Sequence, residues 1–415
     1  MKTPTTSFKT CSPRIELQKG AVLVLDVGTT GIKAFVFDGD CRVIAKAYQT
    51  IKKARPRRGW VEQDPMEILR VSIAVLRKAV KDSGIAPSSI RGMGITNQRE
   101  ATVLWKKTTG KPVYPIIGWE DSRTRRFCQT FSKRDQEAVR RMTGLPIDSY
   151  FSASKIHWIL NRVQGTRELA DDGDLAFGTV DSWLIWNLCE GRPHYTDETN
   201  ASRTLLFNIH TRHWDGSLLK RFDVPKSVLP FVQPSRARFG VLDNMVLGAD
   251  IPILAVCGDQ QASTYAAIRS ASSRHSVKVT YGTGTFVVQV HGKSFFSHPP
   301  FFTTLVPDMT MASFALEGKI EGSSEAVTRL LGNSTKLRMY LKKLAEKADA
   351  LIKQLPTQPK QIIADGGIAR DGIIVGLQEE ISGIPTCLQS TYDGTALGTA
   401  LLVWDAIKLP RENET

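Results

Sequence analysis

The chain has 415 residues, of which 41% are hydrophobic and 23% charged, a composition typical of a soluble globular protein that is too long for one ordinary core. Its 55 Lys and Arg against 41 Asp and Glu give a formal charge of +14. The basic clusters at 52–58 and 123–126 lack the interleaved aromatic residues of a nucleic-acid-binding surface. We therefore expect a solvated basic face and no nucleic acid partner. No apolar run is long enough to span a bilayer, and six cysteines without short spacings exclude a zinc site and favour a reducing compartment.

The first twenty residues carry four basic side chains and no apolar core of a secretory signal. A transit peptide and a frayed terminus are both compatible with this composition. We expect residues 1–20 to be flexible and the protein to be cytoplasmic.

The apolar run at 21–27 is closed by Gly28-Thr-Thr-Gly31, and alternation resumes from 33 to 37. This pattern predicts a β-hairpin. Its backbone N–H groups and threonine hydroxyls can cradle a phosphate. A glycine-rich P-loop ending in Gly-Lys-Ser/Thr is absent. The alternative is an ordinary turn.

A helix is expected to open at Asp64-Pro-Met-Glu67, with an N-cap, a proline at the first position and a capping partner three residues on. Gly84 ends it. A strand and turn then occupy residues 90–100. Arg99 and Glu100 lie where the strand must stop, and together they offer donors and an acceptor to neighbouring hydroxyls of a polyol. The alternative is a surface ion pair, which is usually worth little.

A buried strand at 253–258 ends in Gly258, and Asp259, Gln260 and Gln261 follow. In open α/β sheets ligands collect outside the carboxyl ends of strands, where Asp259 could accept a proton from a substrate hydroxyl. The alternative is that Asp259 caps the following helix. Upstream, Trp119 and Tyr150 lie in segments that mix aromatic and polar residues, so either could belong to the core.

Residues 279–289 repeat the pattern of strand, Gly-Thr turn and strand, so two hairpins could hold a polyphosphate from both sides. Leucines and an alanine between 337 and 351 form a helical stripe. The segment 361–371 again runs from a strand into glycines, where Gly366 and Gly367 would let backbone approach a flat ligand. Small residues at 393–400 predict a tightly packed final helix.

These stretches, in this order, resemble the FGGY carbohydrate kinases, and among them the glycerol kinases. The matching segments are DVGTT at 26–30, GWVEQDPMEI at 59–68, GITNQRE at 94–100, FGTVDSWLIW at 177–186, TNASRTLLFNIHT at 199–211, GDQQA at 258–262, YGTGTF at 281–286, ALEG at 315–318 and DGGIAR at 365–370. GITNQRE discriminates best, because sugar-specific relatives carry other residues at that turn.

The resemblance implies a two-domain α/β, actin-like (ribonuclease-H-like) ATPase fold with the active cleft between the domains. Residues 21–266 would form the polyol-binding domain with the general base, and 267–407 a shortened nucleotide-binding domain before a tail at 408–415. The implied activity is phosphorylation of glycerol to glycerol 3-phosphate with ATP and Mg²⁺. A homo-oligomer is compatible with the sequence.

The family's functional positions are implied residue by residue. Asp259 matches the general base, and the remaining polyol contacts fall on Arg99, Glu100, Tyr150 and Gln260, with Trp119 and Phe286 as apolar walls. The cofactor positions are Thr29, Thr30 and Lys33 on the first side, Thr283 and Gly284 on the second, and Gly366, Gly367 and Asp371 at the base. Asp26 and Asp259 are the expected Mg²⁺ ligands.

Three departures concern the nucleotide side. Lys33 replaces the usual Arg, and Asp371 replaces an Asn that contacts the base. Most of the family's segment between Asn333 and Gln361 has no counterpart. The alternative function is therefore a catalytically impaired polyol-binding or regulatory protein, and a basic nucleic-acid-binding protein ranks far behind both.

Overall fold

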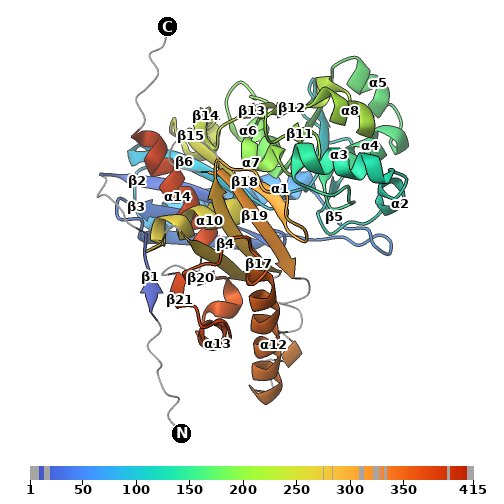
Figure 1. The fold of residues 1–415 in the computed structure, drawn as a ribbon. Helices are drawn as coiled ribbons and strands as arrows, with labels where there is room; N and C mark the ends of the chain where they lie inside the picture. Colours follow the sequence, from blue (N-terminus) through green and yellow to red (C-terminus); the bar gives the residue numbers. More distant parts are fainter. Residues whose placement is uncertain are drawn as a thin grey trace.

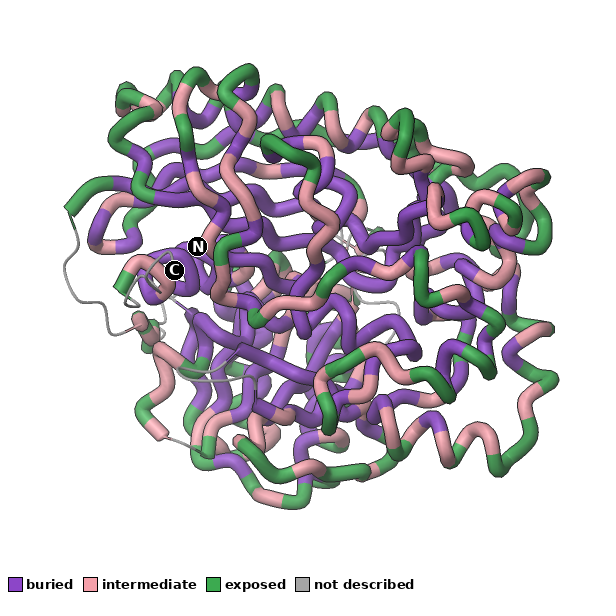
Figure 2. Tube along the Cα trace, turned by 90° about the horizontal axis from the view of Figure 1, so that it is seen from above, coloured by how far each residue is buried: buried purple, intermediate pink, exposed green. Residues whose placement is uncertain are grey.

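The computed structural model describes residues 9–13, 19–273, 275–282, 284–307, 313–320, 327, 329–330, 334–389 and 393–408. Two mixed β-sheets, each flanked by helices, form the body of the molecule (Figure 1). The predicted α/β class is confirmed. Buried residues follow the strands and the helices between them, whereas exposed residues follow the periphery (Figure 2).

The first sheet has six strands in the order β14-β15-β6-β2-β3-β4. Their bounds are Arg236–Val241, Pro252–Gly258, Ile90–Asn97, Ala21–Val27, Gly31–Asp38 and Val43–Thr50. Strands β2, β6 and β15 run parallel, and β2 with β3 forms the predicted antiparallel hairpin. All seven residues of β2 are buried, as expected for a strand covered on both faces.

Side chains of β2 alternate between two cores. Leu23 and Leu25 pack in one cluster with helix α1 (Pro65–Ser83) and helix α6 (Val180–Leu188). Val22 and Val24 face the other cluster, formed with helices α10 (Asp259–Ser270) and α14 (Gly394–Ile407). The first sheet is therefore the middle layer of three.

The second sheet has seven strands in the order β1-β21-β20-β16-β17-β19-β18. Their bounds are Thr10–Cys11, Thr386–Gln389, Gln361–Asp365, Ser276–Tyr281, Thr285–Gly292, Ser313–Ile320 and Phe302–Val306. Strands β16 and β17 form the second predicted hairpin. Within the segment expected to be flexible, β1 pairs in parallel with β21. Helices α12 (Ser334–Ile352) and α13 (Ile373–Ser382) cover this sheet, and α12 carries the predicted apolar stripe.

Smaller elements extend the first half of the chain. The helices are α2 (Arg125–Cys128), α3 (Lys133–Thr143), α4 (Ser152–Arg162), α5 (Thr166–Asp171), α7 (Glu198–Ala201), α8 (Gly216–Phe222) and α9 (Asn244–Leu247). The paired short strands are β5 (Glu62–Gln63) with β8 (Ile116–Ile117), β7 (Val103–Lys106) with β9 (Leu175–Gly178), β10 (Tyr195–Asp197) with β13 (Phe231–Gln233), and β11 (Phe207–Asn208) with β12 (His213–Trp214). Helices α3 and α4 contribute to a separate hydrophobic core.

The capping of α1 differs in one respect from the prediction. Asp64 is the N-cap and accepts from the backbone N–H of Met66, and Gly84 ends the helix in the left-handed conformation. Glu67, however, accepts a hydrogen bond from the backbone N–H of Lys52 at 3.1 Å. The expected capping partner of Asp64 is therefore used to hold the chain that leaves β4.

Within the described part of the chain, none of the helices combines the length and apolarity needed to cross a membrane. All six cysteines are free thiols, as their spacing predicted.

Helix α14 comes last among the described elements but packs on β2, β6, β14 and β15 of the first sheet and on α10. The closest approach is at Gly398, where a Cβ atom would lie 1.8 Å from the carbonyl oxygen of Ala262. Only glycine lets the two helices approach this closely.

Replacing Gly398 by Ala is expected to force α10 and α14 apart and to lower the unfolding free energy by about 1–3 kcal/mol, the usual cost of overpacking. Chemical denaturation followed by tryptophan fluorescence measures this. Gly216→Ala is the matched control, because a Cβ atom there meets nothing within 4 Å. Equal stability of the two variants would contradict the packing argument.

Candidate active site

The candidate site forms where three parallel strands end side by side. Val27 of β2 and Gly258 of β15 are both in register with Asn97 of β6. The turn at 28–30, the segment 98–100 and the start of α10 therefore meet at one sheet edge. Polar side chains gather here because the carboxyl ends of parallel strands share an edge.

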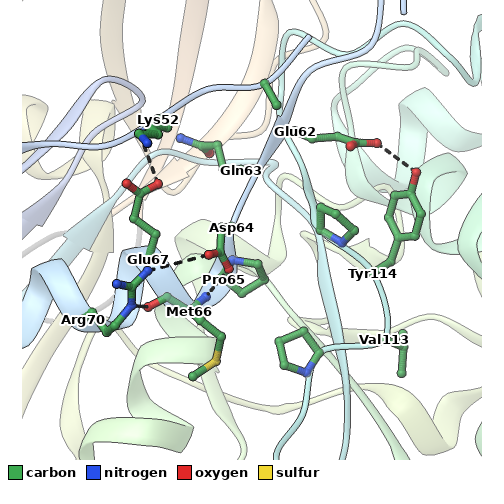
Figure 3. A pocket seen from close by; sticks show the side chains of 13 residues that line it. Lys52, Glu62, Gln63, Asp64, Pro65, Met66, Glu67, Arg70, Val113 and Tyr114 are labelled. Atoms are coloured by element: carbon green, nitrogen blue, oxygen red, sulfur yellow. Dashed lines mark hydrogen bonds and ion pairs between the residues drawn. The ribbon is translucent and has the colours of Figure 1, made fainter. Parts of the chain in front are cut away.

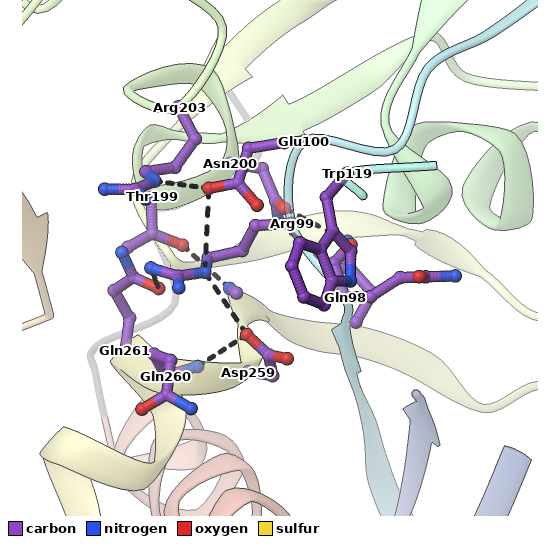
Figure 4. Close-up of polar contacts among 12 residues, drawn as sticks. Gln98, Arg99, Glu100, Trp119, Thr199, Asn200, Arg203, Asp259, Gln260 and Gln261 are labelled. Atoms are coloured by element: carbon purple, nitrogen blue, oxygen red, sulfur yellow. Dashed lines mark hydrogen bonds and ion pairs between the residues drawn. The ribbon is translucent and has the colours of Figure 1, made fainter. Parts of the chain in front are cut away.

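Asp259 is the first residue of α10, and Gly258 is the N-cap. Asp259 is not the N-cap and no side chain bonds at that position, but Oδ1 of Asp259 accepts a hydrogen bond from the backbone N–H of Gln260 at 2.7 Å in the first turn. The carboxylate also lies 3.3 Å from Nε of Arg99 (Figure 4), and 33% of the side chain is exposed. Burial raises the pKa of Asp259 to about 6, although the charge of Arg99 opposes the shift. A half-buried carboxylate with a raised pKa is suited to accept a proton.

Arg99 and Glu100 are buried, with 3% and 1% of their surface exposed. The surface ion pair considered above is therefore wrong. The Glu100 carboxylate pairs with Nε of Arg203 at 2.6 Å and lies 4.0 Å from Nε of Arg99. Glu100 also has a positive φ of 62°, and non-glycine residues in this left-handed region are uncommon and often mark functional sites.

The second sheet contributes an unexpected carboxylate, Glu317 of β19. Its Oε2 lies 2.7 Å from Nη1 of Arg99, and its Oε1 lies 3.1 Å from Nη2 of Arg203. Burial alone would raise the pKa of Glu317, but the two guanidinium groups lower it to about 2. Sequence reasoning gave no role to Glu317 or Arg203, although both lie in matched segments, ALEG and TNASRT.

Aromatic rings line one side of this cluster. The rings of Trp119 and Tyr150 are 5.6 Å apart, and the ring of Phe286 lies 5.9 Å from the Arg99 guanidinium carbon. The indole N–H of Trp119 donates to Oγ1 of Thr29 at 3.0 Å. Lys319, a residue that sequence reasoning missed, places its ammonium 4.6 Å from the Tyr150 ring and 5.0 Å from the Trp119 ring.

A buried lysine fixes the backbone of this region. Nζ of Lys155 on α4 donates to the carbonyl oxygens of Glu100 at 3.0 Å and Tyr150 at 2.8 Å. Burial lowers the pKa of Lys155 to about 8. This single side chain links two predicted polyol positions, and its place on an apolar helix face gave no sequence signal.

The first predicted phosphate region surrounds the turn between β2 and β3. Nζ of Lys33 lies 3.4 Å from Asp26 and 3.0 Å from Asp393, which precedes α14. Burial raises the pKa of Asp26. Thr30 is exposed. The lysine charge is thus shared between two carboxylates.

The second predicted region is described only in part, because Thr283 lies outside the described residues. Gly284 faces the ring of Phe286, and Gln260 lies near Lys278 and Thr280 of β16. At Gly366 (φ 96°) a Cβ atom would lie 2.3 Å from the Tyr281 carbonyl oxygen. This glycine therefore allows a close approach of the protein's own backbone.

The two glycines at the predicted base end differ in their surroundings. A Cβ atom at Gly367 would meet nothing within 4 Å, which leaves space beside it. Asp371 is exposed and accepts a hydrogen bond from the backbone N–H of Ile373 at the start of α13.

No cluster of three or more His, Cys, Asp or Glu side chains suited to a metal occurs among the described residues. Asp26 and Asp259 are close enough for the charge of Asp26 to raise the pKa of Asp259. Two carboxylates fit Mg²⁺, which is usually held by one or two carboxylates together with substrate phosphates and water.

A separate pocket of about 640 Å³ lies at the start of helix α1 (Figure 3). It is lined by Lys52, Ala54, Glu62, Gln63, Asp64, Pro65, Met66, Glu67, Arg70, Pro112, Val113, Tyr114 and Pro115. None of the predicted site residues lines it. Gln63 connects the two regions, because its amide donates to the carbonyl oxygen of Thr29 at 3.0 Å.

Comparison of the chain with known proteins identifies its family. The N-terminal domain of the FGGY family of carbohydrate kinases matches residues 21–266, more than half of the chain. The chain belongs to the FGGY family of carbohydrate kinases.

Two curated relatives of this FGGY protein are glycerol kinases. The protein from Paraburkholderia phymatum is 45% identical over 307 residues, and glycerol kinase 2 from Thermotoga maritima is 44% identical over 309 residues. These alignments cover 73% and 74% of this chain but 61% and 62% of the relatives. The chain thus spans about three fifths of the length of the curated relatives it matches.

Structural likeness extends further along the chain. The crystal structure of Plasmodium falciparum glycerol kinase with ADP matches with a TM-score of 0.86 and 25% identity, covering 94% of this chain and 90% of that one. The ligand-bound xylulose kinase from Lactobacillus acidophilus, at 16% identity, gives a TM-score of 0.80 over 94% of this chain and 90% of that one. The predicted two-domain actin-like fold of this FGGY protein is confirmed.

Proposed function

We propose that this FGGY protein transfers the terminal phosphoryl group of ATP to glycerol and yields glycerol 3-phosphate. The observation that carries the proposal is the position of Asp259. This carboxylate lies at a sheet edge beside Arg99 and Glu100, and the first Gly-Thr hairpin ends at the same edge. The glycerol kinase relatives, and the ADP in the P. falciparum structure, support the choice of substrate and nucleotide.

In this mechanism, Asp259 orients the primary hydroxyl of glycerol and takes its proton as the oxygen attacks phosphorus. Arg99 donates to hydroxyl oxygens and Glu100 accepts from hydroxyl groups, so the two bind neighbouring positions of the polyol. Trp119 and Phe286 pack against its carbon chain. Phosphoryl transfer needs alignment and charge neutralisation more than covalent help, so fixed side chains are the main contribution.

The cofactor sites follow the two hairpins. Thr29, Thr30 and Lys33 would hold phosphates from the first sheet, and Thr283 with Gly284 from the second. Gly366, Gly367 and Asp371 would receive the adenine. Asp26 and Asp259 would hold Mg²⁺, which neutralises phosphate charge when bound. The carboxylates around Lys33 compete with phosphate for its ammonium.

Replacing Asp259 by Asn is expected to lower kcat at least 100-fold, because an amide cannot take the proton. Glycerol binding should persist, since the amide keeps the shape of the side chain. Coupled-enzyme detection of ADP and calorimetric glycerol titration measure the two properties. Turnover near the parent rate would remove Asp259 as the base.

Replacing Arg99 by Ala is expected to weaken glycerol affinity about 10- to 100-fold, the range expected for loss of a charged hydrogen bond. The KM for ATP should change far less. Initial rates at varied glycerol and ATP concentrations separate these effects. An unchanged KM for glycerol would contradict the polyol role of Arg99.

The alternative, a polyol-binding protein without turnover, is favoured by the ion pairs of Lys33 with Asp26 and Asp393, which engage an ammonium group expected to hold phosphate. Thermal shift separates the two functions, because a ligand stabilises the protein that binds it. An active kinase is expected to show a Tm increase of several degrees with Mg-ATP, whereas the impaired protein responds to glycerol alone. ADP release that depends on glycerol decides for the kinase.

A further inference from the structure

We propose that Glu317 is a positioning residue that the second sheet contributes to the polyol site. Glu317 holds Nη1 of Arg99, so that Nη2 stays directed to the substrate and the guanidinium, whose Nε already lies 3.3 Å from Asp259, is not drawn further toward that carboxylate. The inference rests on the proposed polyol role of Arg99.

The donors of Arg99 are divided among distinct partners. Nη1 donates to Oε2 of Glu317 at 2.7 Å and to Oε1 of Gln261 at 3.3 Å. Nε faces Asp259 at 3.3 Å. Nη2 makes no hydrogen bond within the described residues. Because a guanidinium is a rigid planar fork, fixing Nη1 also fixes the direction of Nη2.

Because this contact is buried, removing one of its partners is costly. Arg99 and Glu317 have 3% and 1% of their side chains exposed, and Arg203, the second partner of Glu317, has 0%. A buried cation that loses its partner is strongly destabilised and seeks another anion. The anions nearest to Arg99 after Glu317 are Asp259 at 3.3 Å and Glu100 at 4.0 Å. Both have other roles in the proposed reaction.

The contact also joins the two sheets. Glu317 lies in β19 of the second sheet, whereas Arg99 and Arg203 belong to the first half of the chain. Gln261 makes a parallel link, because its amide donates to Oγ1 of Thr304 in β18 at 2.9 Å. The position of Arg99, and with it glycerol affinity, therefore depends on the second sheet being in place.

The test is Glu317→Gln, which keeps the size of the side chain and removes its charge. Calorimetry is expected to show glycerol affinity at least 10-fold weaker, while the KM for ATP stays within about twofold. In an R99A background the same change should cause no further loss, because both changes act through one guanidinium. A crystal structure of E317Q should show the Arg99 guanidinium displaced toward Asp259 or Glu100.

Glu62→Gln is the matched control. Glu62 pairs with the buried Arg123 at 2.8 Å, so the substitution also removes a carboxylate from an arginine but leaves Arg99 untouched. Glycerol affinity is expected to match the parent. If E317Q does not fold, Glu317→Asp is the second variant. It keeps the negative charge but shortens the side chain by one methylene, which moves the carboxylate away from Arg99, and the same loss of glycerol affinity is expected.

Parent-like affinity and an unmoved Arg99 in E317Q would overturn the proposal, as would parent-like affinity in E317D or additive losses in the double variant. If the parent itself binds no glycerol, the proposed function fails. The position of Arg99 in the E317Q crystal then still decides whether Glu317 positions it.

Discussion

The site depends on a cluster of buried, mutually paired charged side chains, none of which would be stable as a charge in this position without the others. Arg99, Arg203, Glu100 and Glu317 are almost completely buried, and an isolated charge in such surroundings costs several kcal/mol or more. Together they neutralise one another, with Asp259 at the partly exposed end of the cluster. The charges are thus fixed before a substrate arrives, which is the condition for electrostatic catalysis.

The fold provides the frame for these charges through parallel strands. Because β2, β6 and β15 end in register, short segments far apart in sequence meet without long loops. The second sheet adds Glu317 and Phe286 from two adjacent antiparallel strands. Each sheet thus supplies one part of the candidate site, and neither contains all of it.

Much of the architecture could be predicted because it follows from local patterns. The hairpin at 21–37, the helix from 65 to 83 and the strand before Asp259 all show the expected periodicity and capping. Burial of Arg99 and Glu100 could not be predicted, because the sequence of two adjacent opposite charges is the same whether the pair is buried or on the surface. Glu317 is 218 positions from Arg99, and its contact arises only from packing between the sheets. For the same reason the hydrogen bond from the Lys52 backbone N–H to Glu67 could not be predicted, and the sequence instead indicates Glu67 as the capping partner of Asp64.

The strands of the first sheet all lie between residues 21 and 258. Helix α14, residues 394–407, helps to cover one face of this sheet. In a growing chain the strands of that sheet are made before residues 394–407, so the part of the face that α14 covers, which includes Val22, Val24 and Ala255, stays exposed until α14 has been synthesised. Apolar surface left open for so long favours association with other chains. The order of the elements therefore makes complete burial of this face depend on a helix that is synthesised well after the last strand of the first sheet.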